Sequence, residues 1–393
     1  MKTTKNSRLP FVPRFASIDT CRFAFALLLA GAGCAADPAY KNDGSGSAGT
    51  GGSSGGGGGG GTGGSSGGTG GTGNIAPGPG LPVPPGPDNV PPPAGTPGNL
   101  KVLDWAGFKS AVTYTFDDAQ PSQVEHYAEL KALGVRMTFY INSSSSNIEA
   151  TFKQAVIDGH EIGNHTVHHC RADLTMCTNP LASVDAEFDE CTNYIISRLG
   201  QGAVWTSASP YGDTGWDAPA MSRFFINRGV QSGNIPANST YDPFNLPCHG
   251  AVEGETAAMF NAQIDGAETQ GRWLIFLIHT IAPTSQIWYA PIDISVISDS
   301  VAHAKSLGDV WIDSTVNIGA YWRGQKVVAA AQPATSGGGQ TWTWTLPAHF
   351  PPGRNLRVTV DGGTLSQNGA PLTWDPHGYY EIALDAQTLT LSP

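Results

Sequence analysis

The chain has 393 residues, enough for two ordinary domains, and a net charge of −11 with 40% hydrophobic residues. Most of the acidic residues lie in 100–325. An acidic surface repels polyanions, so we expect no nucleic acid partner, whereas neutral or cationic polymers remain compatible.

The N-terminal residues 1–34 have the pattern of an export signal. Several Lys and Arg residues precede the apolar stretch "FAFALLLAGAG" at 23–33, which is too short to span a membrane as a mature helix. Small residues before Cys34 are typical of lipoprotein signals, so we expect lipidation of Cys34 and membrane contact only through that anchor. "AGA" at 30–32 would also suit an ordinary signal peptidase, so a freely secreted protein is the alternative.

A biased segment separates this signal from the rest of the chain. Residues 42–74 are almost all Gly, Ser and Thr, and residues 76–98 are rich in Pro. Neither stretch can bury apolar area. We therefore predict a disordered linker over 35–99.

From residue 100 the pattern alternates between strands and helices. The predicted strands are 111–116, 136–142, 161–165, 203–208, 229–234, 272–279 and 309–314. The predicted helices are 121–133, 148–158, 181–199, 218–228, 255–270 and 291–307. This alternation predicts an α/β domain over 100–325 with a parallel sheet, open or closed into a barrel. In such a barrel, functional residues gather at the carboxyl ends of the strands.

Residues 326–393 lack helical periodicity. The segments "QTWTWTL", "NLRVTVDG", "YYEIAL" and "QTLTLS" are separated by Gly, Pro and Asn, which predicts a small β-rich module. Trp342 and Trp344 fall on one face of a predicted strand. We favour core packing for this pair over a platform for stacking sugars.

Four cysteines follow the signal, and in an exported chain they predict two disulfides. We favour the pairs Cys170–Cys177 and Cys191–Cys248 among the three possible connectivities. A Cys/His zinc site around Cys170 is the alternative.

Ionisable residues gather at three predicted strand ends: Asp117 and Asp118, then His165, His168 and His169, and finally His279. Histidines spaced i, i+4 lie on one face of a helical turn and can bind one metal ion, and His165 and His169 have that spacing. Two histidines, one carboxylate and water form an open zinc site. The residues therefore predict an Asp/His/His metal site, without showing which aspartate binds the metal.

Four motifs, "TFDDA" (115–119), "HEIGNHTVHH" (160–169), "SPYG" (209–212) and "LIH" (277–279), resemble the polysaccharide deacetylases with a NodB-homology domain. The resemblance extends over about residues 109–323. It implies a distorted (β/α) barrel and one divalent metal ion, with Zn²⁺ expected.

The resemblance also implies a role for each matching residue. Asp118, His165 and His169 match the metal ligands, Asp117 matches the general base, and His279 matches the general acid.

Residues of the shorter motifs match groups that surround the substrate. The backbone N–H of Tyr211, which follows Pro210, matches an oxyanion donor, and Leu277 matches the acetyl-pocket leucine. Thr166 matches a residue that steadies the second motif.

Two parts of the family pattern are missing. Ala208 stands where the family has an arginine that partners the base, and no Asp–Trp pair occurs around 227–234. Substitutes for these residues could be Arg228, Asp213 or Asp242, and the sequence does not choose between them.

We therefore expect an exported, monomeric, metal-dependent enzyme that removes N-acetyl groups from GlcNAc polymers such as peptidoglycan or a chitin-like glycan. An O-acetyl esterase acting on xylan or an exopolysaccharide, or a catalytically silent carbohydrate-binding lipoprotein, are the alternatives. The candidate sugar-stacking residues are Trp205, Trp216, Trp288 and Tyr289.

Overall fold

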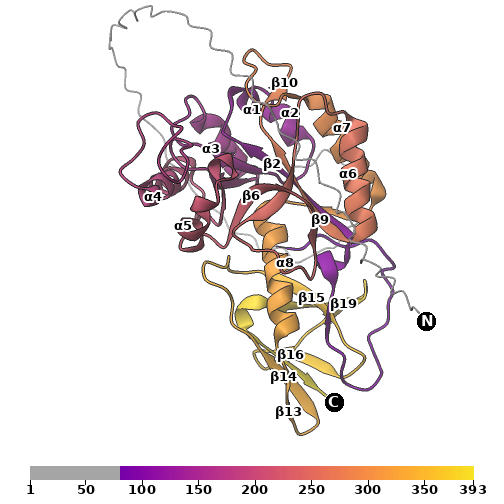
Figure 1. Cartoon of the computed structure of the whole chain (residues 1–393). Coiled ribbons are helices and arrows are strands. Elements are labelled where there is room, and N and C mark those ends of the chain that lie inside the picture. Colours follow the sequence, from indigo (N-terminus) through magenta and orange to yellow (C-terminus); the bar gives the residue numbers. More distant parts are fainter. Residues whose placement is uncertain (1–79) are drawn as a thin grey trace, which may run out of the picture. The chain divides into compact units, whose positions relative to one another are not determined.

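The structure, a computed structural model, describes residues 80–393 (Figure 1). The predicted export signal, the lipidation of Cys34 and the first part of the predicted linker, 35–79, lie outside the described residues. Among residues 80–393, no helix has the length and apolar character needed to cross a membrane.

The central element is a closed ring of parallel strands in the order β2-β3-β4-β5-β6-β8-β9, in which β9 pairs again with β2. These strands are β2 Ser110–Asp117, β3 Thr138–Ile141, β4 Glu161–Asn164, β5 Thr206–Ala208, β6 Ile226–Ser232, β8 Leu246–Gly250 and β9 Arg272–Ile278. The structure thus confirms the predicted α/β barrel.

Helices connect and cover these strands (Figure 1). They are α1 Pro121–Glu125, α2 Tyr127–Ala132, α3 Glu149–Ile157, α4 Val184–Tyr194, α5 Asp217–Met221, α6 Ala257–Gln270, α7 Ile294–Leu307 and α8 Thr315–Ala330. Short strands complete the domain: β7 Ile235–Pro236, β10 Ile281–Ala282, β11 Ile292–Asp293 and β12 Val310–Ile312.

The barrel is distorted at β2. The start of this strand, Ser110–Val112, pairs with β12, whereas its end, Thr115–Asp117, pairs with β3. One edge of β2 therefore pairs first with β12 and then with β3. On its other edge, β2 pairs with β9 from Ala111 to Phe116, which brings the carboxyl ends of these two strands together.

Every residue of β2 is buried, and its side chains alternate between two environments. Val112, Tyr114 and Phe116 pack in the hydrophobic layer that also contains residues of the helices. Thr113 and Thr115 are outside this apolar cluster and bond within the barrel: Thr113 Oγ1 accepts from Trp273 Nε1, and Thr115 Oγ1 donates to Phe276 O. Asp117 continues the polar series.

Three predicted elements differ from the structure. The predicted helix 218–228 is the short α5 followed by β6, which starts at Ile226. Strand β8, with the sequence LPCHG, was not predicted, because it is short and contains Pro and Gly. No helix was predicted after residue 307, whereas α8 runs from Thr315 to Ala330 and crosses the predicted domain boundary at residue 325.

Two glycines explain why α8 is hard to recognise. Gly319 and Gly324 lower its helix propensity. A Cβ at Gly319 would lie 2.3 Å from Ile226 Cδ1, and a Cβ at Gly324 would lie 2.5 Å from Leu384 Cδ1. A larger residue at either position would therefore require Ile226 or Leu384 to shift where the helix packs against the barrel and the C-terminal strands.

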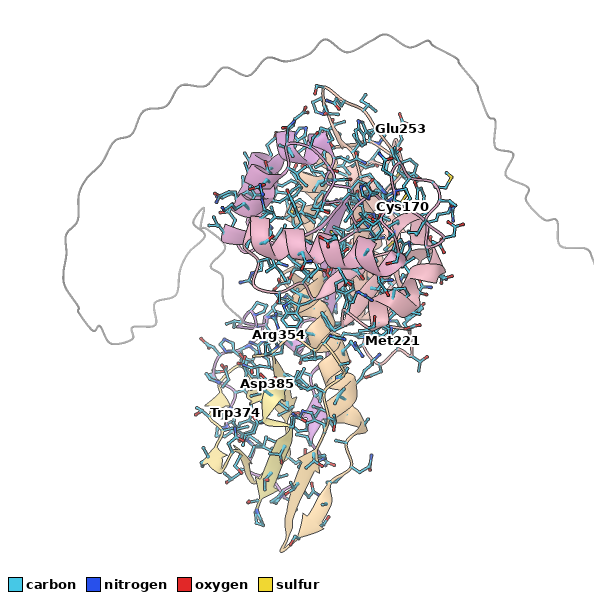
Figure 2. All side chains as sticks on the ribbon, turned by 90° about the vertical axis from the view of Figure 1, so that its left-hand side faces the viewer. Cys170, Met221, Glu253, Arg354, Trp374 and Asp385 are labelled. Atoms are coloured by element: carbon cyan, nitrogen blue, oxygen red, sulfur yellow. A yellow bond between two sulfur atoms is a disulfide. The ribbon has the colours of Figure 1, made fainter. Side chains whose placement is uncertain are left out.

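The predicted β-rich module is present after α8. One sheet has the order β1-β15-β19-β18, formed by β1 Lys101–Val102, β15 Asn355–Thr359, β18 Trp374–Asp375 and β19 Tyr379–Ala383. The other has the order β13-β14-β20-β16-β17, formed by β13 Ala334–Ser336, β14 Gly339–Thr343, β16 Thr364–Gln367, β17 Ala370–Pro371 and β20 Thr388–Ser392. Figure 2 marks Trp374 and Asp385 in this module and Cys170 in the barrel.

Trp342 and Trp344 are buried in the second hydrophobic cluster. The predicted core packing of this pair is therefore confirmed. Neither ring is available to stack on a sugar.

The last part of the predicted linker, residues 80–99, is packed against the C-terminal module. This part is therefore ordered, whereas the composition predicted disorder. Val90 N donates to Pro376 O and Gly95 N donates to Asp361 O, both at 2.8 Å. Trp374 Nε1 donates to Val90 O at 2.8 Å. A Pro-rich segment loses little conformational entropy when it is ordered, so these few bonds are enough to hold residues 80–99.

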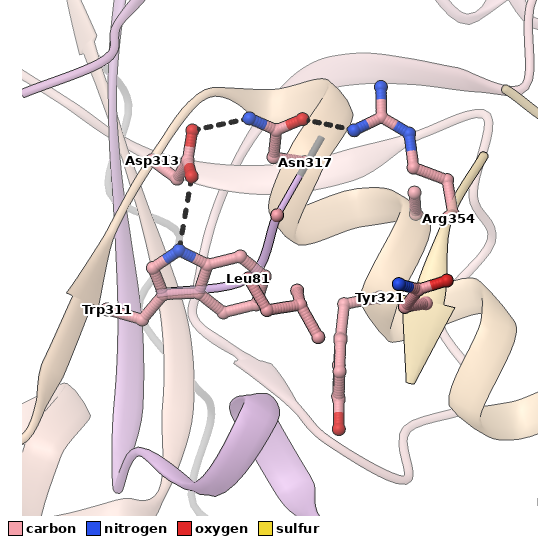
Figure 3. A pocket seen from close by; sticks show the side chains of 9 residues that line it. Leu81, Trp311, Asp313, Asn317, Tyr321 and Arg354 are labelled. Atoms are coloured by element: carbon pink, nitrogen blue, oxygen red, sulfur yellow. Dashed lines mark hydrogen bonds between the residues drawn. The ribbon is translucent and has the colours of Figure 1, made fainter. Parts of the chain in front are cut away.

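A polar chain of contacts lies where β12, α8 and the module meet (Figure 3). Asp313 accepts from Trp311 Nε1 and from Asn317 Nδ2, and Arg354 donates to Asn317 Oδ1. These bonds join the end of the barrel to the start of β15.

The buried side chain of Arg357 is expected to stabilise the folded protein. Its side chain is 1% exposed, stacks on Tyr379, and donates to Leu81 O, Pro82 O, Ala106 O and the Glu381 carboxylate. We expect Arg357→Met to lower the free energy of unfolding by about 3 kcal/mol, because the acceptors around this buried guanidinium lose their donor. Denaturant unfolding measures this loss.

The matched control is Arg198→Met, which removes an exposed ion pair with Glu149. This change should cost less than about 0.5 kcal/mol. Equal effects of the two substitutions would contradict a stabilising role for Arg357.

Candidate active site

The two neighbouring aspartates both face the cavity at the carboxyl end of the barrel. Adjacent residues of a regular strand point to opposite faces. Here β2 ends at Asp117, and Asp118 and Ala119 have φ values of 76° and 51°, so the chain leaves the extended conformation at once. This left-handed turn brings both carboxylates to the same side.

Gln123 ties the ends of β2 and β9 together. Its Nε2 donates to Asp117 O at 2.6 Å and to His279 O at 3.0 Å. The motif with the paired aspartates and the motif with His279 are thus held next to each other by one buried amide.

Asp118, His165 and His169 form a group that could hold a metal ion. Their ligand atoms all lie within 4.8 Å of one another. Asp118 Oδ1 lies 3.4 Å from His165 Nε2 and 3.3 Å from His169 Nε2, and it is buried with no hydrogen-bond partner among residues 80–393. A carboxylate oxygen and two imidazole nitrogens that converge in this way fit a divalent transition metal ion.

The orientation of His165 supports this fit. Its Nδ1 lies 2.9 Å from Ala208 O, so Nδ1–H donates to this carbonyl and Nε2 keeps its lone pair toward Asp118. Metal-binding histidines are commonly fixed in this way by a bond from the other ring nitrogen.

The second motif forms a loop instead of the helical turn that the i, i+4 spacing predicted. Thr166 and His169 have φ values of 69° and 54°. Thr166 Oγ1 accepts from His169 N at 2.9 Å, which closes the loop and places both histidines together. The family resemblance pointed to Thr166 for this role.

His168 points away from the metal ligands. Its Nδ1 contacts Glu187 Oε1 at 2.9 Å, and the other oxygen of Glu187 accepts from His168 N and Val167 N. Glu187 is buried, and it anchors the loop from behind. The structure therefore separates His168 from His165 and His169.

The ionisation states of Asp118 and His169 suit a bound cation. Burial disfavours the ionised form of Asp118, yet bonding to His165 and the charges of the two histidines hold the pKa of Asp118 below its usual value. Burial and the neighbouring His165 lower the pKa of His169 to about 4, so this imidazole is neutral at pH 7. A neutral imidazole is the form that binds a metal.

Arg228 occupies the place next to Asp117. It lies on β6 directly opposite Ala208 of β5 in the register of the two strands. Its fully buried guanidinium contacts Asp117 Oδ2 through Nη2 and Gly229 O through Nη1. The arginine that is missing at residue 208 is thus replaced from the adjacent strand.

Asp213 and Asp242 have local roles instead. Asp213 accepts from Gly215 N and Ala172 N, and Asp242 accepts from Phe244 N. Both carboxylates satisfy backbone donors of surface loops, which distinguishes them from Arg228.

His279 follows the end of β9 and lines the same cavity. Its ring meets the edge of Tyr289 with 4.9 Å between centroids. Burial lowers the pKa of His279, while the charges of Asp117 and Asp118 act in the opposite direction. Among residues 80–393, no group bonds to its buried Nδ1, so the missing Asp of the fourth motif has no replacement there.

The cavity has a volume of about 680 Å³. Besides the residues described above, Leu277 and Tyr211 line it, and Pro210 starts the turn Pro210–Gly212 that carries Tyr211. The Tyr211 ring lies 4.5 Å from that of His169, and its hydroxyl donates to Met176 O. The structure therefore brings together all of the predicted site residues of the four motifs.

One predicted disulfide is present and the other was wrong. Cys170 is bonded to Cys177, which confirms this pair and excludes a zinc site at Cys170. Cys191 and Cys248 are buried free thiols that form no disulfide within residues 80–393. They belong to different hydrophobic clusters, Cys191 with the helix layer and Cys248 with the second cluster, so they cannot meet.

The candidate sugar-stacking residues divide into two groups. Trp216 is fully buried against Phe188, and Trp205 packs against the second cluster. Trp288 and Tyr289 are 56% and 67% exposed. Of the four candidates, Tyr289 is the one that also lines the catalytic cavity, whereas Trp205 lines a different cavity.

Several solved structures resemble this chain at low identity. A family 4 acetyl xylan esterase from Clostridium thermocellum, solved with a cobalt ion, is 16% identical over 53% of this chain and 89% of its own, with a TM-score of 0.37. A family 4 carbohydrate esterase from Streptomyces lividans, in complex with acetate, is 16% identical over 53% and 92%, with a TM-score of 0.37. A polysaccharide deacetylase from Bacillus cereus is 17% identical over 52% and 91%, with a TM-score of 0.35.

The match to a family model is more direct. Residues 107–223 match the model described as polysaccharide deacetylase, and this range contains Asp118, His165 and His169 of the candidate metal site. Through residues 107–223, this chain therefore contains a region that matches the polysaccharide deacetylase family.

Proposed function

We propose that this protein is a metal-dependent polysaccharide deacetylase that hydrolyses N-acetyl groups of GlcNAc-containing polymers, with Zn²⁺ as its metal. The observation that carries the proposal is the pairing of buried Asp117 with Arg228 beside the Asp118/His165/His169 group, in one cavity with His279. The acidic surface and the predicted export signal support an exported monomer that meets a neutral glycan, either anchored at Cys34 or secreted.

An amide carbonyl is a poor electrophile, so its hydrolysis needs an activated water molecule and a protonated leaving group. A divalent ion held by Asp118, His165 and His169 supplies Lewis acidity to the water and the carbonyl. Asp117 accepts a proton as the water oxygen bonds to the acetyl carbon. Arg228 keeps the Asp117 carboxylate turned toward the water.

The leaving nitrogen departs as the C–N bond breaks, and His279 donates a proton to it. The proton taken by Asp117 balances this step, so acetate and an amine are released. The N–H of Tyr211 stabilises negative charge on the acetyl oxygen, which is worth about 3 kcal/mol for a well-placed donor. Leu277 is 4% exposed and offers an apolar wall for the methyl group.

Two specific features favour competing functions. The same residues could hydrolyse an acetyl ester, since an alkoxide leaving group needs less help from His279 than an amine does. The unpartnered Nδ1 of His279 favours a glycan binder without activity. Comparing acetate release from chitooligosaccharide, peptidoglycan and acetylated xylan separates these functions.

One set of assays tests both the need for a metal ion and the role of Asp117 as the base. We expect the zinc-loaded protein to release acetate from N-acetylglucosamine oligomers, and a chelator to abolish the release until zinc is restored. Asp117→Asn should lower kcat by about 10²- to 10⁴-fold, because the water loses its proton acceptor. Metal content should stay at the wild-type level, since Asp118 and the histidines remain.

The control is Asp185→Asn, which changes an exposed carboxylate that pairs with Arg223 on the surface. This variant should keep the wild-type kcat. Stoichiometric zinc without acetate from either amide or ester substrates would show that the protein is a binder.

Arg228 is tested by Arg228→Met. We expect kcat to fall by about 10- to 100-fold at unchanged zinc content, as is typical when a residue that orients a catalytic group is lost. Removing one partner of a buried ion pair also costs about 3–5 kcal/mol of stability, so kcat is measured below the lowered Tm.

The matched control is Arg223→Met on the surface near the start of the same strand. It should leave kcat unchanged and shift Tm little. Wild-type kcat in a folded Arg228→Met protein would contradict the assignment of Arg228 as the partner of the base.

A further inference from the structure

A separate cavity, of about 570 Å³, lies at the amino ends of the barrel strands, opposite the candidate active site. Its lining residues include Arg136 before β3, Glu161 at the start of β4 and Trp205 directly before β5. The start of α8 and the loop before β15 also line it. Its volume is that of an ordinary pocket for a small organic molecule.

This cavity brings two guanidinium groups together in a protein that is acidic as a whole, since Arg136 and Arg354 both line it. Burial lowers the pKa of Arg354, the carboxylates of Glu161 and Asp313 act in the opposite direction, and the positive charge of Arg136 lowers it further. An anion held between the two guanidinium groups would offset both the burial and the repulsion.

The carboxylates near Arg354 are bonded to other groups. Glu161 is buried and accepts from two threonine hydroxyls and one backbone N–H. Asp313 accepts from Arg136 Nη1 at 3.2 Å and from three other donors. Neither carboxylate forms an ion pair with Arg354 within residues 80–393.

Arg354 therefore keeps a donor without an acceptor. Its Nη1 donates to Asn317 Oδ1 at 2.5 Å, whereas its buried Nε has no hydrogen-bond partner among residues 80–393. Nε and Nη2 together form one edge of the planar guanidinium, and such an edge matches the two oxygens of a carboxylate. A buried donor without an acceptor costs free energy, which a bond to a ligand oxygen would recover.

His160 adds a second donor of this kind to the lining. It is 4% exposed, and its Nδ1 accepts from Met137 N at 3.1 Å, so Nε2 carries the proton. This Nε2 is buried and has no partner among the described residues. Burial lowers the pKa of His160 to about 4, so the ring is neutral at pH 7 and the two arginines supply the positive charge.

The rest of the lining narrows the class of ligand. The half-buried ring of Trp205 packs against the second hydrophobic cluster and lines the cavity. Gly202 and Pro352 also line it and are exposed, so the cavity is open to solvent. An indole ring suits the flat apolar body of an organic acid, and the volume is larger than an inorganic ion needs.

We propose that this cavity binds a small organic carboxylate, with its charged group between Arg136 and Arg354 and a flat apolar body against Trp205. The site is independent of the proposed deacetylase activity, because no residue lines both this cavity and the catalytic one. The carboxylate and a glycan can therefore be bound at the same time.

Binding is measured by calorimetry on the zinc-loaded full chain. The probes are benzoate, benzamide, which has the same shape without the charge, and inorganic phosphate. We expect benzoate to bind at least about 10-fold more tightly than either of the others, and Arg354→Met to weaken benzoate binding by about 10- to 100-fold, as for the loss of a hydrogen bond to a charged group. Arg354→Lys keeps the charge without the planar edge, so it should weaken binding less than Arg354→Met does.

Two control variants locate the bound benzoate. Arg198→Met removes an exposed guanidinium that pairs with Glu149 outside the cavity, and it should change the affinity by no more than about twofold. Asp118→Ala removes a ligand of the proposed catalytic metal, and benzoate should still bind to it with the parent affinity.

Each outcome decides the proposal. Benzoate binding that persists in Asp118→Ala and falls in Arg354→Met or Arg354→Lys, with each variant folded by its Tm, supports the site. Loss of binding in Asp118→Ala would place the carboxylate at the catalytic metal and overturn it. Benzamide or phosphate binding as tightly as benzoate, parent affinity in both folded Arg354 variants, or no benzoate binding by the parent would also overturn it.

Discussion

The ion pair between Asp117 and Arg228 is the constraint on which the site depends. Both side chains are buried in the barrel, where an unpaired carboxylate would cost several kcal/mol. Arg228 offsets the cost of burying the Asp117 carboxylate and also fixes its orientation. The register of β5 and β6 places Arg228 opposite Ala208, so the positive charge enters from one strand further along the ring.

The closure of the barrel brings this pair next to the other residues of the proposed active site. Because β9 pairs with β2, His279 and Leu277 arrive next to the aspartates, and Gln123 holds the two strand ends together. The proposed base, Asp117, is therefore held on both sides. The proposed acid, His279, is held less firmly, because nothing among residues 80–393 bonds to its Nδ1. The module contributes stability to this scaffold, since its tryptophans face the core and α8 packs on both parts.

Much of the fold and most of the site could be predicted from the sequence. The alternation of strands and helices predicted a parallel sheet, open or closed into a barrel, and the favoured Cys170–Cys177 disulfide is present. Strand β8 and the whole of α8 were missed because tertiary packing overrides their weak local signals. The pairing of Cys191 with Cys248 failed because the sequence does not show on which side of the barrel wall each thiol lies.

The sequence by itself determined the chemistry that the chain carries: two aspartates, three clustered histidines and a lone histidine, each at the end of an apolar strand. It left Arg228, Asp213 and Asp242 as equal candidates for the missing partner. Only the tertiary structure chose Arg228, turned Asp118 to the same side as Asp117 and brought Arg136 and Arg354 to one cavity. The physical reason is that strand register, a left-handed turn and loop packing bring together residues that are far apart or differently oriented along the chain.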